Sequence, residues 1–137
     1  MSVVREGTDI ALLAVGKMVG VASTAAEALQ AEGLSCTVVD ARFVKPIDPN
    51  LAELAARHRA VLTIEDGTAI GGFGDAVLEA LAEAGLAVPL RRLGLPDRFI
   101  EHGAQALLLH SFSLDAEGVA EAARELLRLH RPSVLAG

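Results

Sequence analysis

The chain has 137 residues, with 12 basic and 18 acidic side chains and a formal net charge of −6. This length suits one compact domain with its own core. No Lys or Arg stripe could follow a phosphate backbone, and four Phe without Trp or Tyr offer no stacking platform, which argues against nucleic-acid binding. No apolar run reaches the roughly 18 residues that span a bilayer, and no secretory signal opens the sequence. We therefore predict a cytoplasmic protein without a membrane partner.

The first part of the chain predicts a strand, a helix and a second strand. Residues 1–8 are mixed and polar, and we interpret them as a linker or chain start without regular structure. Residues 9–15 are almost continuously apolar, which is typical of a central parallel strand. Apolar residues then recur at helical spacing from Met18, and Gly33 ends that helix. Residues 34–39 form the next predicted strand.

The middle of the chain repeats this alternation. Asp48 and Pro49 are typical of a helix start, because Asp accepts free N–H groups and Pro needs no partner at the first helical position. Residues 60–64 are an apolar, β-branched run that predicts a strand buried on both faces. An acidic turn at Glu65 and Asp66 and a glycine-rich loop follow, and a new helix is expected to begin near Phe73 and end at Gly85.

The last part predicts one more strand and one more helix. Residues 88–93 form a predicted strand, in which Pro89 indicates either a sheet edge or the start of the strand. Residues 95–103 are irregular, and Asp115 caps a final helix that runs to about residue 130, with residues 131–137 as a tail. Alternating strands and helices predict an α/β fold, a three-layer αβα sandwich with a mostly parallel open sheet of about five strands over residues 9–130.

In such a sheet, ligands bind at the loops that leave the carboxyl ends of the strands. The most informative loop combines Glu65 and Asp66 with Gly71, Gly72 and Gly74. Free N–H groups at the following helix start could hold a phosphate, but two nearby carboxylates would repel it unless a cation intervened. We favour the simpler interpretation that the glycines allow close packing and the acids accept loop N–H groups.

A second informative segment spans residues 93–103, where two acids, an Arg and a His fall in a loop fixed by Pro96. Its charged residues could line a site or hold a partner chain, or they could form a self-satisfied set of ion pairs that covers the sheet. Arg98 could also pair with Glu65 or Asp66. The candidate interface or active-site-support residues of the whole chain are Glu65, Asp66, Gly71, Gly72, Phe73, Gly74, Asp97, Arg98, Phe99, Glu101 and His102.

Other reactive residue types give weaker signals. Cys36 is the only cysteine, which excludes an internal disulfide, and we interpret it as a small buried apolar residue. His58, His110 and His130 are expected to be solvated or to cap helices. No serine lies in a nucleophile elbow and no His pair has metal-ligand spacing. From the residues alone, a binding or assembly domain is favoured over an enzyme.

Three motifs, taken together, resemble a known family. They are Asp-Ala-Arg-Phe-Val-Lys-Pro-Ile-Asp at 40–48, Glu-Asp at 65–66 leading to Gly-Gly-Phe-Gly-Asp-Ala-Val-Leu-Glu at 71–79, and Leu-Gly-Leu-Pro-Asp-Arg-Phe-Ile-Glu-His-Gly at 93–103. This pattern is similar to the C-terminal domain of 1-deoxy-D-xylulose-5-phosphate synthases, within the transketolase C-terminal domain family. The resemblance covers about residues 3–129, and the third motif is its most specific part.

The resemblance implies an enzyme that uses thiamine diphosphate and Mg²⁺ to join a two-carbon unit from pyruvate to glyceraldehyde 3-phosphate, in isoprenoid precursor synthesis. In that family the Gly-Asp-Gly cofactor motif lies in the N-terminal domain and the activating glutamate in the middle domain. Neither motif is present here, so the resemblance implies no catalytic, cofactor-binding or metal-binding residue in this chain. It implies instead a domain that packs against the N-terminal and middle domains and a homodimer partner, and that is inactive alone.

Two alternatives remain open at this point. The β-subunit of 2-oxo-acid dehydrogenases has a similar C-terminal domain that serves partly in docking, although the third motif favours the synthase. An autonomous interaction module is the other alternative, and the chain itself is either an excised domain or a natural split subunit. The segment Leu-His-Ser-Phe-Ser at 109–113 departs from the more regular helix-to-loop passage expected there, which leaves the parent activity less defined than the family.

Overall fold

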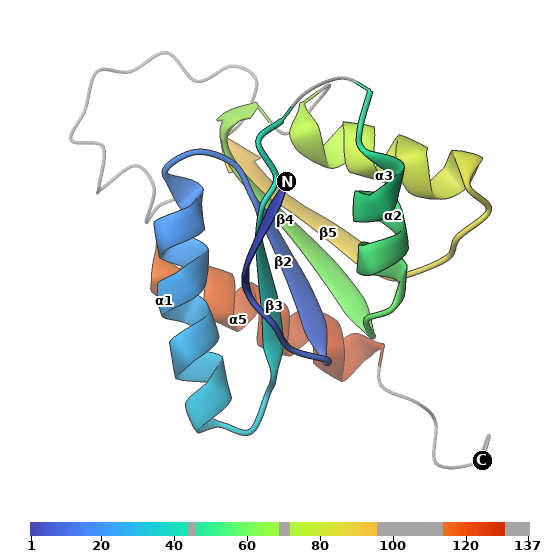
Figure 1. Cartoon of the computed structure of the whole chain (residues 1–137). Helices are drawn as coiled ribbons and strands as arrows, with labels where there is room; N and C mark the ends of the chain where they lie inside the picture. The colour runs from blue at the N-terminus through green and yellow to red at the C-terminus, as the bar shows by residue number, and fades with distance from the viewer. Residues whose placement is uncertain (44–45, 69–71, 96–113, 131–137) are drawn as a thin grey trace, which may run out of the picture.

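A computed structural model describes residues 1–43, 46–68, 72–95 and 114–130. In the described residues, a five-stranded sheet has the order β1-β3-β2-β4-β5 and is flanked by helices (Figure 1). The strands are β1 (Ser2–Arg5), β2 (Ile10–Ala14), β3 (Cys36–Asp40), β4 (Ala60–Thr68) and β5 (Leu90–Leu95). The helices are α1 (Met18–Ala31), α2 (Pro49–Ala56), α3 (Phe73–Glu83) and α5 (Ala116–Leu129).

The centre of the sheet is parallel. β2 pairs with β3 on one side and β4 on the other, and β4 pairs with β5, all in the parallel direction. All five residues of β2 are buried, because helices cover both faces of this strand. The predicted central strand is therefore confirmed, and so is the edge position of the strand that follows Pro89.

Two local expectations were wrong. Residues 1–8 were expected to lack regular structure, but Ser2 and Val3 pair antiparallel with Asp40 and Val39, so that β1 becomes an edge strand. β1 forms because the backbone of β3 offers it hydrogen-bond partners. The periodicity of four residues alone does not reveal such a distant partner. The acidic turn after Ile64 is also absent, because β4 continues to Thr68.

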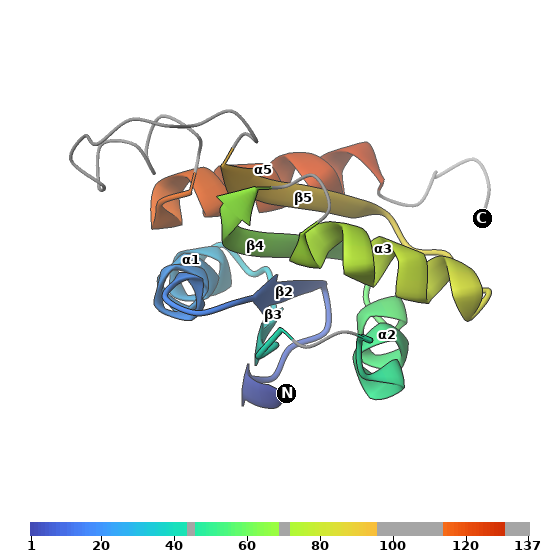
Figure 2. The same cartoon turned by 90° about the horizontal axis from the view of Figure 1, so that it is seen from above.

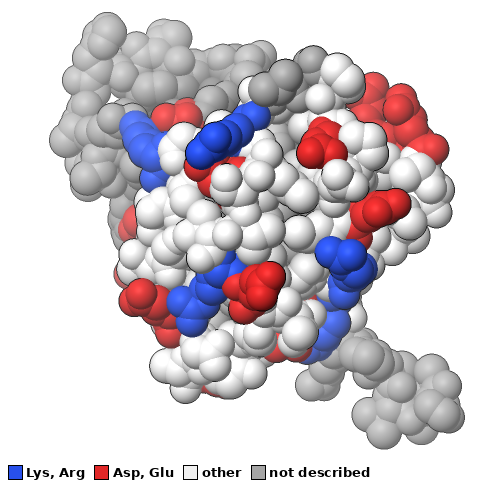
Figure 3. Space-filling model, in the orientation of Figure 1, with Lys and Arg blue, Asp and Glu red and all other residues white. Residues whose placement is uncertain are grey.

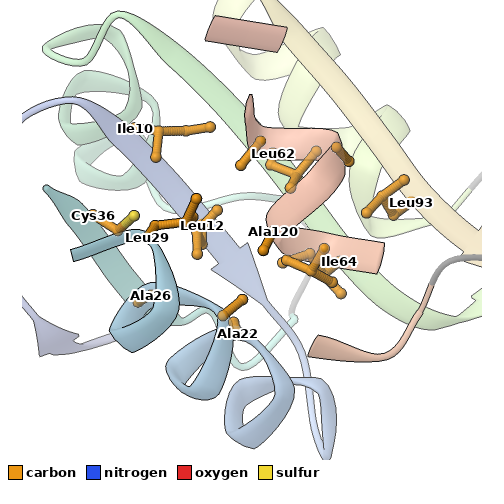
Figure 4. Close-up of a cluster of buried hydrophobic side chains, with 14 of the residues drawn as sticks. Ile10, Leu12, Ala22, Ala26, Leu29, Cys36, Leu62, Ile64, Leu93 and Ala120 are labelled. Carbon is orange, nitrogen blue, oxygen red and sulfur yellow. The ribbon is translucent and has the colours of Figure 1, made fainter. Parts of the chain in front are cut away.

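The two faces of the sheet carry separate cores, so the fold has three layers (Figure 2). Ile10 and Leu12 point toward α1 and α5, where they pack with Leu29 and Leu62 (Figure 4). Ala11 and Leu13, which alternate with them along β2, belong to the opposite core with α2 and α3. The expected αβα sandwich is confirmed.

The predicted helix caps are present. The Asp48 carboxylate accepts the Asn50 N–H at 2.9 Å, with Pro49 as the first helical residue. The Asp115 carboxylate accepts the Gly118 N–H at 2.8 Å at the start of α5. Both helices thus begin where local sequence provides an acceptor for otherwise unpaired donors.

Candidate functional site

The carboxyl ends of three neighbouring strands meet at one edge of the sheet. Ala14 of β2 is level with Asp40 of β3 on one side and with Ile64 of β4 on the other. The loops after these strands therefore share this edge, as predicted for a parallel sheet. Across it, Lys17 Nζ lies 3.5 Å from Asp66 Oδ2, with both side chains about half exposed.

An irregularity in β4 positions the first acidic residue. Ile64 pairs with Leu93 and Thr68 pairs with Leu95, so three residues of β4 lie opposite one residue of β5. Such a bulge bends a strand and redirects its side chains. Glu65 lies within this bulge and is only 8% exposed.

Glu65 caps the start of α3 from another element. Its Oε1 accepts the Phe73 N–H at 3.1 Å and its Oε2 accepts the Gly74 N–H at 2.8 Å. Helix starts present free N–H groups and partial positive charge, so a carboxylate stabilises them in the way a local N-cap would. The interpretation that an acid accepts loop N–H groups is confirmed for Glu65.

This cap also determines whether the start of α3 can bind an anion. The two N–H groups that would bind a phosphate are already bound to an internal carboxylate, and the side chain of Asp66 adds a further negative charge nearby. The arrangement does not fit a diphosphate site. Among the described residues, no group of three His, Cys, Asp or Glu side chains could hold a metal ion either.

Gly74 permits the close contact between α3 and the sheet. A Cβ at this position would lie 2.7 Å from Thr63 Oγ1 and 2.7 Å from Cγ of Arg92. Thr63 is fully buried, and its hydroxyl has no hydrogen-bond partner in the described part of the chain. The Arg92 guanidinium forms an ion pair with Asp75 in the first turn of α3.

Phe73 anchors the same helix start in the core. Its ring is 1% exposed and packs edge to face on Phe43, with ring centroids 5.5 Å apart. Gly72 precedes it as the N-cap residue and contributes no side-chain hydrogen bond. The first turn of α3 is therefore held by the packing of Phe73 on Phe43 and by the hydrogen bonds from its N–H groups to Glu65.

The remaining candidate residues lie outside the described parts of the chain: Gly71, Asp97, Arg98, Phe99, Glu101 and His102. The suggested ion pair of Arg98 with Glu65 or Asp66 falls there too. Glu65 and Asp66 have other partners, which are the α3 backbone and Lys17 respectively.

A polar cluster at the opposite edge of the sheet was not predicted. His58 Nδ1 donates to the Leu54 carbonyl at 2.8 Å, and its Nε2 lies 2.7 Å from the Thr37 hydroxyl. That hydroxyl also donates to the Gly7 carbonyl and accepts the Gly7 N–H. The expected capping role of His58 is confirmed, but its ring is held between two elements rather than solvated. A cavity of about 580 Å³ adjoins this cluster.

The thiol of Cys36 is buried and is expected to be unreactive. Cys36 is 1% exposed, and burial raises the pKa of its thiol to about 11. The reactive species of cysteine is the thiolate, which this raised pKa disfavours. The interpretation of Cys36 as a buried apolar residue is confirmed.

Comparison with known proteins identifies the family. A family model described as "Transketolase, C-terminal domain" matches residues 1–119. The chain belongs to this family. This transketolase C-terminal domain is 50% identical to a 1-deoxy-D-xylulose-5-phosphate synthase of Cupriavidus taiwanensis over 95% of its residues, and 48% identical to that of Aquifex aeolicus over 90%. It spans about a fifth of the length of these relatives, 20% in both cases.

Solved structures agree with the family assignment. One described as a split gene transketolase, an inactive beta4 tetramer, has a TM-score of 0.85 and 40% identity, covering 95% of the transketolase C-terminal domain and 43% of that protein. A transketolase variant from Pichia stipitis has a TM-score of 0.63 at 17% identity, with coverage of 96% and 18%, and supports the fold alone. Within the described residues, no helix has both the length and the apolar character to cross a membrane.

Proposed function

We propose that this chain is the C-terminal domain of a cytoplasmic 1-deoxy-D-xylulose-5-phosphate synthase. That enzyme would condense pyruvate with glyceraldehyde 3-phosphate, using thiamine diphosphate and Mg²⁺ bound to its other domains. The observation that carries the proposal is the identity of 44–52% to synthases of this name over 88–95% of the chain. The domain itself would serve structure and dimer assembly.

The geometry at the carboxyl ends of β2, β3 and β4 favours a structural role for this domain over a cofactor-binding role. Glu65 accepts the free N–H groups at the start of α3, and Asp66 forms an ion pair with Lys17, so these three charged side chains have partners within the fold. A fixed helix start of this kind can position a neighbouring loop without contacting a cofactor. Residues 97–102, which follow β5, are proposed to contact the other domains or the partner subunit.

A domain exchange tests the proposal. The matching C-terminal fifth of the Cupriavidus taiwanensis synthase would be replaced by this chain, and formation of 1-deoxy-D-xylulose 5-phosphate would be measured. We expect the chimera to keep activity within about tenfold of the parent, whereas a synthase truncated at the junction should lose it. A folded dimeric chimera that binds thiamine diphosphate but forms no product would overturn the proposal.

Calorimetry on the isolated chain separates a supporting domain from a cofactor protein. Thiamine diphosphate with Mg²⁺ should give no saturable heat, because the helix-start N–H groups are already bound to Glu65. Saturable binding would contradict a purely supporting role and would place a cofactor site in this domain.

A further inference from the structure

A groove lies between α3 and the segment that leads into α2. It has a volume of about 390 Å³. Its lining residues are Pro46, Ile47, Ala76, Glu79, Ala80 and Glu83. The lining is therefore apolar along its length and acidic on the α3 side.

Within the described parts of the chain, no basic side chain is paired with the acidic side of the groove. Glu79 and Glu83 are four residues apart on α3 and therefore repel each other on one face. Glu83 is the last residue of α3, where the helix dipole disfavours an anion, and the last turn contains no basic residue. Among the ion pairs of the described residues, none includes Glu79 or Glu83.

The distribution of charged side chains on the surface agrees with the lack of ion pairs at Glu79 and Glu83 among the described residues. On the face shown in Figure 3, acidic side chains gather at the upper right over α3, without a basic side chain beside them. Elsewhere on that face, blue and red side chains lie close together. On this face, the acidic end of α3 is thus an exception among charges that are otherwise mixed.

We propose that the α3 groove docks a basic amphipathic helix of a separate partner polypeptide. The alkyl stem of a Lys or Arg would lie on Ile47 and Ala80, and its cation would pair with Glu79 and Glu83. A neutral apolar segment would instead desolvate two carboxylates without pairing them, which is unfavourable. We draw this from the groove and its charges alone, independently of the proposed synthase function.

The first test uses a defined probe. A synthetic helical peptide with a Leu face and a Lys face is titrated into the ¹⁵N-labelled chain at low salt, and amide shifts are followed by NMR. We expect saturable shifts confined to Ile47 and to the part of α3 from Ala76 to Glu83, weakening as salt is added. The same peptide with Glu in place of Lys should not bind. Shifts spread over every acidic surface, or no saturable binding, would overturn the proposal.

Matched double variants separate the groove from general charge. Glu79→Gln with Glu83→Gln should weaken the Lys peptide about fivefold to tenfold, as two partly exposed ion pairs predict. The control, Glu27→Gln with Glu53→Gln, makes the same change in net charge on exposed residues of α1 and α2 and should change affinity less than twofold. Equal weakening by both double variants would reject the groove. Unfolding curves establish that each variant folds.

Discussion

At the level of single residues, Glu65 joins the sheet to α3. It is buried, and each carboxylate oxygen accepts one backbone N–H of the helix start. We expect Glu65→Ala to lower the free energy of unfolding by about 1–3 kcal/mol, because two donors lose their acceptor in a buried place. Urea denaturation measures the loss, and amide exchange of Phe73 and Gly74 should accelerate.

The control for this substitution is Glu53→Ala, which removes an exposed acid from α2 and should change stability by less than about 0.5 kcal/mol. If Glu65→Ala and Glu53→Ala are equally stable, the carboxylate is not the cap described here. Glu65→Gln retains one acceptor but brings an NH₂ group toward backbone donors, so it should not restore full stability.

The buried Cys36 thiol predicts that the stability of the fold decreases at alkaline pH. Burial raises the pKa of this thiol from 9.0 to about 11. The stability that the neutral thiol contributes is therefore complete below about pH 9 and is lost as pH rises through about 11. Between pH 8 and 10.5 the native chain should lose about 2 kcal/mol more stability than Cys36→Ala, as measured by urea denaturation. Parallel pH profiles for the two proteins would contradict this prediction.

At the level of elements, two helical glycines provide a matched pair. Gly74 contacts Thr63 and Arg92 so closely that a Cβ would lie 2.7 Å from each, whereas a Cβ at Gly20 of α1 would meet nothing within 4 Å. Gly74→Ala should destabilise the fold by about 1–3 kcal/mol through overpacking. Gly20→Ala should stabilise it by about 0.5–1 kcal/mol by improving helix propensity. Thermal unfolding distinguishes the two, and effects of the same sign would show that the α3 contact tolerates a side chain.

The elements also show what local sequence can predict. The helix starts at Asp48 and Asp115 were predictable, because each depends on residues within a few positions of the start. The start at Phe73 was predicted from the glycine-rich loop before it, although the carboxylate that caps it, Glu65, lies eight residues earlier in β4. β1 was not predictable from its own four residues, since its hydrogen-bond partner is the edge of β3, more than thirty positions further along the chain. The extension of β4 past Ile64 likewise depends on pairing with β5.

At the level of the whole molecule, the sandwich and its strand alternation followed from hydrophobic periodicity. The candidate site was predicted only in part. Glu65 was chosen because an acid after a buried strand and before glycines is a locally visible pattern. The contacts of His58 with Thr37, of Phe43 with Phe73 and of Lys17 with Asp66 join distant elements, and no single window contains their signal.

The direction of β1 also has a consequence for how such a domain is attached. β1 runs opposite to the other strands, so Ser2 is level with Asp40, at the same end of the sheet as Lys17 and Glu65. Any polypeptide joined ahead of residue 1 would be tethered close to that edge rather than to the far end of the sheet. A short tether raises the effective concentration of the edge against its neighbour. The antiparallel strand would thereby favour docking in one orientation before any interface contact forms.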